Sequence, residues 1–396
     1  MASPGPSPWL RLTAVAVAAV TVLSVVSGAT GMGTAHRLLA ALALPPLGAV
    51  TLAAWSAHRQ LLRPSLAAGS LFAAAAFARS PELHLALAAA ALAASTVLAA
   101  LAYRGQRQPF GSWRDYLALT KPRVMSLLLL TGFCGLVAGA QGLPSPTVTV
   151  VSMVGLALAC GGAAALNHVL DRDIDRLMGK RTRLRPVAAG RIAPSHALEF
   201  GLALSALSFT VLAGTVNVLA ATLALVGNLF YVVVYTRWLK RATAQNIVIG
   251  GAAGAVPPLV GWAAATGNLA LPALFLFLIV FLWTPPHFWA LALLLKRDYA
   301  AAGVPMLPVV RGERATARQI LLYSAFLVAF SAVPFLAGSF GSIYLGVALT
   351  LGAWLLWLAA RLNARPTAAR ASALFHYSLL YLALLFVAAA VDPLVL

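Results

Sequence analysis

The sequence predicts an all-α fold, a polytopic transmembrane helical bundle. Of the 396 residues, 61% are hydrophobic and 9% are charged, whereas soluble domains are about 45–50% apolar and about 25% charged. The apolar residues form long continuous runs, unlike the short alternating segments of a membrane β-barrel. Lys and Arg number 28 against 9 acidic residues, a net charge of +19. Because the cations gather in short loops between apolar runs, they indicate membrane topology rather than nucleic-acid binding.

Residues 1–110 are expected to form an appended N-terminal bundle. A span takes about 20 apolar residues, which predicts about four spans here, near 10–29, 38–57, 64–79 and 83–103. Only one positive charge, Arg11, precedes the first run, and further apolar runs follow at once. We therefore expect a first span rather than a cleaved leader. The polar connector that follows is the predicted domain boundary, with basic residues Arg104, Arg107, Arg114, Lys121 and Arg123.

Residues 111–396 are expected to form a nine-helix domain. Its predicted spans lie near 124–142, 147–170, 197–214, 216–236, 246–265, 270–294, 319–337, 342–361 and 374–391. Basic loops alternate with loops that contain no Lys or Arg. The positive-inside rule then places the basic loops and the N-terminus in the cytoplasm and the C-terminus outside. Cys134 and Cys160 fall inside apolar runs, so they predict buried thiols and no disulfide framework.

Acidic residues are rare enough to interpret one by one. Three of them, Asp171, Asp173 and Asp175, follow the apolar run that ends at Leu170, and Asn167 precedes them. Residues four apart on a helix differ by only about 40°. Asn167, Asp171 and Asp175 are therefore expected on one stripe, with Asp173 pointing elsewhere. The other acids are expected at solvated or interfacial span ends: Glu82, Asp115, Glu199, Glu313 and Asp392.

Two carboxylates one turn apart at the mouth of a membrane helix are costly unless a cation joins them. Oxygen ligands with open positions suit Mg²⁺, which completes its shell with substrate phosphates and water. The alternative is a solvated helix end whose acids pair with Arg172 and Arg176.

Two basic clusters could hold a diphosphate beside this stripe. Residues 179–191 carry several cations, including Arg185, and residues 235–246 carry Lys240 and Arg241. Guanidinium groups bind phosphate oxygens bidentately, and no Walker loop or GxGxxG element competes for the phosphate. Asn246 opens the next span, where it could line a cavity. The alternative for both clusters is a loop set by topology alone, with Asn246 as a helix cap.

Two proline pairs interrupt predicted spans. Pro257-Pro258 is expected to break its helix and leave backbone bordering a cavity. The second pair, Pro285-Pro286, precedes His287, and a His within a span is a candidate functional residue. A core His bonded to a freed carbonyl is the alternative. Asp298, beyond this span, could join a metal site or simply pair with Lys296 or Arg297.

At these residues the chain resembles a known family. The pattern Asn-x3-Asp-x3-Asp from Asn167 to Asp175, followed by Arg-Pro and Ala-Gly-Arg within 185–191, is similar to the intramembrane prenyltransferase (UbiA) superfamily. Residues 120–124 resemble that family's start. The stretches 235–251, 283–289 and 298–310 are similar to its haem-farnesylating branch. The resemblance covers about residues 113–392, and residues 1–110 do not resemble the usual short N-terminus of that branch.

The resemblance implies a nine-helix bundle whose central cavity opens toward the cytoplasm and the lipid. It implies farnesyl diphosphate as donor, Mg²⁺ as cofactor and haem B as acceptor, giving haem O in the plasma membrane. Product delivery to a haem A synthase or a terminal oxidase is also implied. The chain departs from the wider superfamily at two places: His168 stands where many members have Asp, and Asp298 stands alone where they have a paired Asp-x3-Asp.

The resulting hypothesis gives each candidate residue a role. Asn167, Asp171 and Asp175 hold Mg²⁺, and His287 orients haem or water. The expected diphosphate ligands are Lys121, Arg123, Arg185, Lys240, Arg241 and Lys296. Residues expected at the cavity and the acceptor are Tyr235, Asn246, Trp283, Asp298 and Tyr299. Two alternatives are prenyl transfer to a quinone precursor or chlorophyllide, and transport of an anionic lipid or metabolite through a site at broken helices.

Overall fold

The computed structural model describes residues 109–395 and parts of the first 108 residues. Of the four expected N-terminal spans, the third corresponds to α3 (Leu62–Phe77), and the other three fall largely outside the described residues. The remaining described pieces are 13–14, 16–18, 21, 47–48, 50–51, 87–88, 90–92, 94–95 and 97–98. Among them, the Thr21 hydroxyl donates to Ser95 Oγ over 3.4 Å. Residues 1–110 as a separate bundle therefore stay a prediction.

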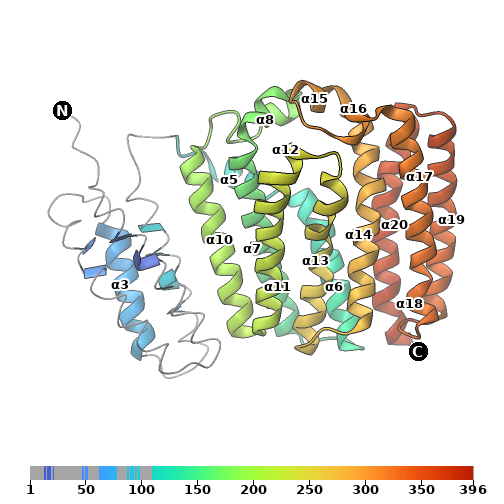
Figure 1. Cartoon of the computed structure of the whole chain (residues 1–396). Coiled ribbons are helices and arrows are strands. Elements are labelled where there is room, and N and C mark those ends of the chain that lie inside the picture. Colours follow the sequence, from blue (N-terminus) through green and yellow to red (C-terminus); the bar gives the residue numbers. More distant parts are fainter. Residues whose placement is uncertain are drawn as a thin grey trace.

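The described part of the chain contains nine helical segments long and apolar enough to cross a membrane, as predicted. The protein is thus a multi-pass membrane protein built as an antiparallel helical bundle (Figure 1). The first segments are α6 (Pro122–Ala140), α7 (Pro146–Leu170), α10 (Pro194–Thr215) and the run of α11 (Val218–Leu229), η2 (Phe230–Leu239) and α12 (Lys240–Ala242). The others are α13 (Asn246–Thr266), α14 (Leu271–Leu294), α17 (Gly312–Ser331) with α18 (Val333–Leu336), α19 (Ser342–Ala364) and α20 (Ala368–Val395).

Two segments differ in extent from the sequence prediction. The span expected near 216–236, the fourth of the nine-helix domain, continues as a helix to Ala242. Lys240 and Arg241 therefore lie on a helix and not in a loop. The seventh span begins at Gly312 rather than near 319. In both cases polar turns continue the helix beyond the apolar run, and hydropathy alone does not detect them.

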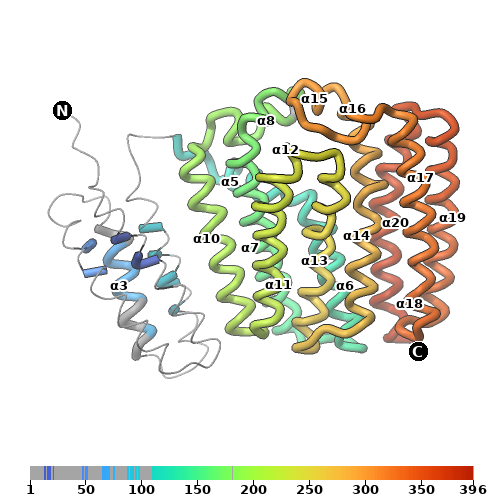
Figure 2. Tube along the Cα trace, in the orientation of Figure 1, coloured from blue at the N-terminus to red at the C-terminus, as the bar shows by residue number. Residues whose placement is uncertain are grey.

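Short helices gather at one end of the bundle. They are α5 (Trp113–Leu119), α8 (Arg172–Leu177), α9 (Lys180–Arg183), α15 (Lys296–Ala301) and α16 (Leu307–Val310). Figure 2 shows α8, α12, α15 and α16 along the upper end, whereas the C-terminus lies at the lower end. The basic loops share this upper end, as the alternation of charged and uncharged loops predicts.

The proline pairs do not break their helices, contrary to expectation. α13 runs through Pro257 and Pro258, and α14 runs through Pro285 and Pro286. A Cβ added at Gly135 of α6 would lie 2.4 Å from the Pro258 carbonyl oxygen, and one at Gly261 would lie 1.9 Å from the Gly132 oxygen. Small residues thus bring the two backbones into contact. The polar backbone around the first pair packs against α6 instead of lining a cavity.

A buried apolar cluster attaches the short helices to the bundle. Ile174 and Met178 from the α8 region pack with Trp289 of α14 and with Met306 and Leu307 near α16. Trp289 is 2% exposed. Burying large side chains of this kind contributes about 1.5–3 kcal/mol each. The cluster therefore holds α8, which carries part of the acidic stripe, against the membrane helices.

The isolated acids occupy several kinds of position. Asp392 is buried rather than solvated, because its carboxylate accepts the backbone N–H groups of Gly341 and Tyr344 at the start of α19. Asp115 lies in a capping box with Ser112 and pairs with Arg191 at 2.7 Å. The Ser112 backbone N–H and Arg191 lower the pKa of Asp115 to about 2.

Candidate active site

The candidate site lies at the end of α7 that faces the short helices. Asn167 is in the last turn of α7, Asp171 joins α7 to α8, and Asp175 is on α8. The sequence reasoning expected one continuous helix here, and the structure has a junction at Asp171. The backbone bonds still run from Asp171 N–H to the Asn167 oxygen (2.9 Å) and from Asp175 N–H to the Asp171 oxygen (2.8 Å). The four-residue spacing therefore survives the junction.

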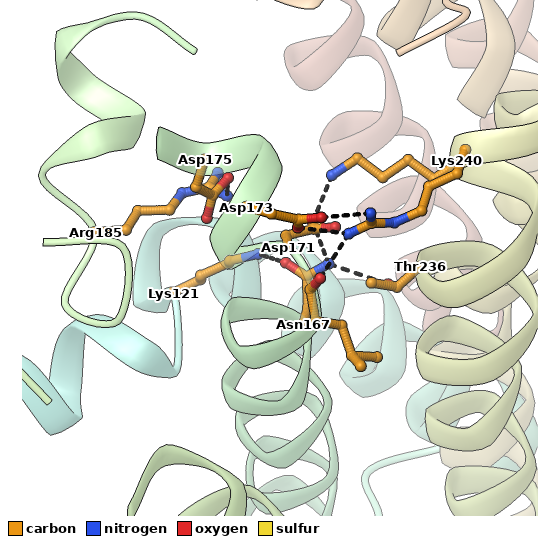
Figure 3. A network of polar contacts seen from close by, with 10 residues as sticks. Lys121, Asn167, Asp171, Asp173, Asp175, Arg185, Thr236 and Lys240 are labelled. Atoms are coloured by element: carbon orange, nitrogen blue, oxygen red, sulfur yellow. Dashed lines mark hydrogen bonds and ion pairs between the residues drawn. The ribbon is translucent and has the colours of Figure 1, made fainter. Parts of the chain in front are cut away.

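Asn167 is the centre of the hydrogen-bond network in Figure 3. Its Oδ1 accepts from Lys121 Nζ over 2.6 Å. Its Nδ2 donates to Asp171 Oδ2 over 2.8 Å and to Thr236 Oγ1 over 3.0 Å. Asn167 is 2% exposed and Thr236 is fully buried. The amide is therefore fixed in orientation, with its oxygen toward a cation and its nitrogen toward a carboxylate.

Each acid of the run has a cation partner from another segment. Lys240 Nζ lies 2.5 Å from Asp171 Oδ2, and Arg185 Nη1 lies 2.7 Å from Asp175 Oδ1. Arg241 binds both oxygens of Asp173 at 2.7 Å and also donates to the Leu170 carbonyl.

Asp173 differs from its two neighbours in exposure. Its side chain is 60% exposed, whereas Asp171 and Asp175 are fully buried. Arg241 lowers the pKa of Asp173 below its usual range. The structure thus places Asp173 away from the other two acids, and Arg241, an expected diphosphate ligand, is paired with it.

The two buried carboxylates share one feature that bears on a metal. Asp171 Oδ1 and Asp175 Oδ2 are buried and have no hydrogen-bond partner, whereas the other oxygen of each is paired. Burial raises the pKa of Asp175 even though Arg185 acts to lower it. A buried unpaired carboxylate oxygen is costly, and a hard cation is the partner it prefers. The residues present therefore fit a divalent ion.

The set of candidate metal ligands is small. Among residues 109–395 and the described N-terminal pieces, no group of three or more His, Cys, Asp or Glu residues is placed to hold a metal. Two carboxylates and an amide suit Mg²⁺, because it binds through one or two carboxylates and keeps sites for phosphates and water.

Lys121 has a strained backbone next to the network. Its φ is +51° and its ψ is 58°, the left-handed region, and Pro122 opens α6 directly after it. A residue before proline is disfavoured in the right-handed region, and the left-handed region costs about 1–2 kcal/mol. Burial, followed by the charge of Arg185, lowers the pKa of Lys121 to about 7. The surroundings of Lys121 therefore disfavour the positive charge of its amine. A bound anionic ligand would favour that charge instead.

The π-helix η2 helps to shape the site. Thr236 lies within η2, and Lys240 begins α12 directly after it. A π-helix is rare and is often found at functional sites. In this protein, both Thr236 on η2 and Lys240 directly after it contact residues at the α7–α8 junction.

Two expected diphosphate ligands lie elsewhere. Lys296 Nζ pairs with Glu313 at 2.9 Å, and its side chain is 38% exposed. Arg123 is exposed in the first turn of α6. The structure thus gathers Lys121, Arg185, Lys240 and Arg241 around the acids, but it does not bring Lys296 into that network.

His287 and Trp283 form a second group that is bound to α20. His287 Nδ1 lies 2.7 Å from Ser378 Oγ, and Trp283 Nε1 donates to the Ser378 carbonyl over 2.7 Å. The His287 ring stacks on Trp283 with centroids 4.2 Å apart and on Phe375 at 4.7 Å. His287 is 7% exposed. Its described polar contact is with Ser378, not with the acids.

The remaining acceptor candidates lie around the edge of the acidic stripe. Burial raises the pKa of Tyr299 to about 12, with Arg185 acting in the opposite direction and Asp171 in the same one. Its phenol is therefore within electrostatic reach of the stripe. Asp298 lies against Gly179, whose added Cβ would be 2.6 Å from Asp298 Oδ2.

Asn246 and Tyr235 are the last two candidates for the cavity and the acceptor. Asn246 is fully buried, donates to the Thr243 carbonyl over 2.7 Å and leaves its Oδ1 without a partner. The Tyr235 ring covers Gly250 and stacks on Tyr231 at 5.5 Å.

The sequence did not predict a role for two residues of these groups, and it gave a third residue no role in the site. Thr236 and Ser378 were given no role, because a Thr or Ser in a span usually bonds its own helix. His168 was noted only as a departure, yet it is 2% exposed and neither ring nitrogen has a hydrogen-bond partner.

The chain is similar in sequence to proteins of known family. Residues 128–386 match the model of the UbiA prenyltransferase family. The chain is 56% identical over 281 residues to a protoheme IX farnesyltransferase of Symbiobacterium thermophilum, covering 70% of this chain and 94% of the relative. It is 54% identical over 281 residues to one of Thermus thermophilus, covering 71% of this chain but 46% of that longer relative.

Solved structures agree at the level of the fold. A digeranylgeranylglyceryl phosphate synthase aligns with a TM-score of 0.60 and 19% identity, covering 72% of this chain and 99% of that one. A UbiA homologue from Archaeoglobus fulgidus bound to DMAPP and Mg²⁺ aligns with a TM-score of 0.56 and 21% identity, covering 70% and 99%.

Proposed function

The chain belongs to the UbiA prenyltransferase family, and on that premise we propose that it is a protohaem IX farnesyltransferase. It transfers the farnesyl group of farnesyl diphosphate to a vinyl group of haem B, and hydration gives haem O. The acceptor is supported by the relatives, which are named for this activity. The observation that carries the diphosphate chemistry is the pair of buried carboxylates on one stripe, each with one unpartnered oxygen, among four cations.

The donor binds at the α7–α8 junction with its diphosphate among these cations. Asn167, Asp171 and Asp175 hold Mg²⁺, which neutralises charge on the diphosphate when bound. Four cations face three carboxylates in this cluster. Three of the cations balance the three carboxylates, so Lys121, once an anionic ligand favours its protonated form, and a divalent ion supply the charge that suits a diphosphate.

The chain's own cations assist departure of the diphosphate. As the C–O bond breaks, the electron pair leaves with the diphosphate, and negative charge grows on it. Lys121, Arg185 and Lys240 are held in place before the reaction, so they stabilise that charge most in the transition state. The allylic cation that remains needs surroundings without water, and the apolar helices around the site supply them.

The acceptor step forms a carbon–carbon bond. A haem vinyl carbon donates its electron pair to the farnesyl cation, and the new cation beside the macrocycle is captured by water. That water loses a proton and leaves the hydroxyl group of the product. His287, whose Nδ1 lies 2.7 Å from Ser378 Oγ, orients the haem or this water.

We infer from the positive-inside rule that this site faces the cytoplasm, and we propose the plasma membrane as its location. Lys121, Arg185, Lys240 and Arg241 lie around it, and within residues 111–396 the loops of the opposite end, 141–147, 214–217, 266–272 and 338–342, carry no Lys or Arg. The product is consumed by a membrane enzyme that oxidises haem O or by a terminal oxidase that takes it up.

A product assay tests the proposal. Membranes containing the full chain, supplied with haem B, farnesyl diphosphate and Mg²⁺, should form haem O, detected by chromatography and mass. A chelator should stop the reaction, and added Mg²⁺ should restore it. Farnesylation of a quinone precursor with haem B left unchanged would refute the acceptor. Product formation that is indifferent to the chelator would refute the metal site.

A further inference from the structure

A cavity separate from the candidate active site lies at the basic end of the bundle. It is an open hollow of about 470 Å³ between the start of α17 and the turn that joins α19 to α20. Three arginines line it, Arg314 and Arg318 from α17 and Arg365 from the turn, together with the polar residues Asn363 and Thr367. We refer to it as the arginine cavity. None of its lining residues takes part in the network around Asn167.

The three guanidinium groups of the arginine cavity lack acidic partners. All three side chains are exposed, and none of them takes part in an ion pair that the described residues form. Cations gathered around one hollow repel one another, and an anion between them removes that repulsion. Guanidinium groups bind phosphate with two parallel hydrogen bonds, so a phosphate group suits the cavity.

Arg370 orders the turn that carries Arg365. Its Nη1 donates to the Arg361 carbonyl over 2.6 Å and to the Arg365 carbonyl over 3.3 Å. These bonds cover carbonyl groups at the end of α19 that would otherwise repel an anion. The turn is thus held with its backbone carbonyls satisfied by a cation.

The helix faces beside the cavity distinguish a lipid from a soluble phosphate. On α17, Arg314 and Arg318 are followed at four-residue spacing by Leu322 and Phe326, which are 51% and 69% exposed. One helical face therefore passes from cations to exposed apolar side chains, which is the order of a phospholipid's headgroup and chains.

The neighbouring helix α19 repeats this order. Trp354 and Trp357 are 52% and 44% exposed, and their rings lie 4.5 Å apart. The Arg361 guanidinium lies 4.6 Å from the centre of the Trp357 ring. Ala364, which lines the cavity, is seven residues beyond Trp357 and so on the same face. On α19 too, exposed aromatic side chains in the span are followed by Arg361 near its basic end, and α17 and α19 stand side by side at the edge of the bundle (Figure 1).

From this arrangement we propose that the arginine cavity binds the headgroup of an anionic phospholipid. The lipid phosphate lies among Arg314, Arg318 and Arg365, and the acyl chains lie along the exposed apolar faces of α17 and α19. Basic pockets between membrane helices bind acidic headgroups in this way. This lipid site lies outside the residues assigned to prenyl transfer, so the proposal does not depend on the proposed enzymatic function.

Native mass spectrometry of the detergent-solubilised full chain tests this proposal. The probes are phosphatidylglycerol and phosphatidylcholine with the same acyl chains. The wild type should retain phosphatidylglycerol at least about tenfold better, because each basic residue near the membrane surface attracts acidic lipid. The double variant Arg318→Gln/Arg365→Gln should lose that preference, and Arg318→Lys/Arg365→Lys should retain most of it.

A matched variant removes the same charge elsewhere. Arg114→Gln/Arg297→Gln neutralises two exposed arginines outside the cavity and should bind phosphatidylglycerol like the wild type. Equal retention of the two lipids by the wild type, or equal loss in both double variants, would overturn the proposal. Displacement of the lipid by glycerol phosphate at equal concentration would also overturn it, because the site would then recognise a free phosphate ester.

Discussion

Two groups of buried polar side chains in the bundle differ in whether their atoms have hydrogen-bond partners. In the acidic stripe, Asp171 Oδ1 and Asp175 Oδ2 have no partner although both residues are fully buried. In the group around His287, the Nδ1 atom and the Trp283 indole both bind Ser378. Buried polar atoms without partners are rare in folded proteins and call for an explanation. Unpartnered atoms also occur elsewhere in the described residues, such as Trp289 Nε1 and Tyr344 Oη, but only in the acidic stripe are they carboxylate oxygens, which a metal can bind.

This contrast also separates roles within one short run of acids. Asp173 is two residues from both Asp171 and Asp175, yet both of its oxygens are held by Arg241, and it is mostly exposed. It offers a control that differs from its neighbours in environment but not in chemistry.

Replacing Asp175 by Asn should have the largest effect. The amide can still accept from Arg185, but it cannot offer a charged oxygen to a metal, so the rate of haem O formation should fall by roughly 10²–10³-fold or more. Asp171→Asn should behave in the same way. Haem O formation in membranes at saturating Mg²⁺ measures the effect, and elution as a single detergent-solubilised species checks folding.

Asp173→Asn is the matched control for both substitutions. Because Asp173 lies off the stripe, its replacement should change the rate by less than about fivefold, the equivalent of roughly 1 kcal/mol. An equal loss of activity in all three variants would mean that the run acts as a general charge cluster, and the distinction between paired and unpaired oxygens would then be wrong.

Replacing Lys240 by Gln should have the next largest effect. Lys240 is 8% exposed and lies 2.5 Å from Asp171, so its loss removes a preorganised charge near the leaving diphosphate. We expect a fall of about 10²-fold in kcat/KM for farnesyl diphosphate. Lys296→Gln is the control, because Lys296 pairs with Glu313 outside the network. A larger loss for Lys296→Gln would restore the original expectation that this lysine binds the diphosphate.

Replacing His287 by Ala should have the smallest effect on the donor. Haem use should fall while binding of farnesyl diphosphate is retained, since His287 contacts Ser378 and not the acids. The KM values for haem B and for farnesyl diphosphate, measured separately, test this. Ser378→Ala removes the hydrogen bond and should give a weaker defect of the same kind. A raised KM for farnesyl diphosphate in either variant would place this group in the donor site.

Much of the fold was predictable because the bilayer imposes a local requirement. Each span must be long, apolar and helical to satisfy its backbone without water, so nine spans could be located from hydropathy alone. Their ends were less predictable. The polar turns up to Ala242 and from Gly312 continue the helices beyond the apolar runs, and helix continuation through polar residues depends on packing and on capping contacts.

The effect of the prolines on their helices could not be predicted from the local sequence either. Pro257 and Pro258 indicated a broken helix, but α13 continues through them. Their effect depends on α6, where Gly132 and Gly135 allow the two backbones to touch. That partner helix lies more than a hundred residues earlier in the chain, so no local pattern reports it.

Two properties could be read from the amino-acid sequence: the protein crosses a membrane, and Asn167, Asp171 and Asp175 share a helical face. Both follow from the chemistry and periodicity of residues that are close in the chain. The side chains that meet this face were identified only once the helices were packed together. That packing brought Thr236 to Asn167 and Lys240 to Asp171, both across 69 residues, and it gave Lys296 to Glu313. Helical periodicity acts over a few residues, whereas the pairing of charges between helices depends on how whole helices pack.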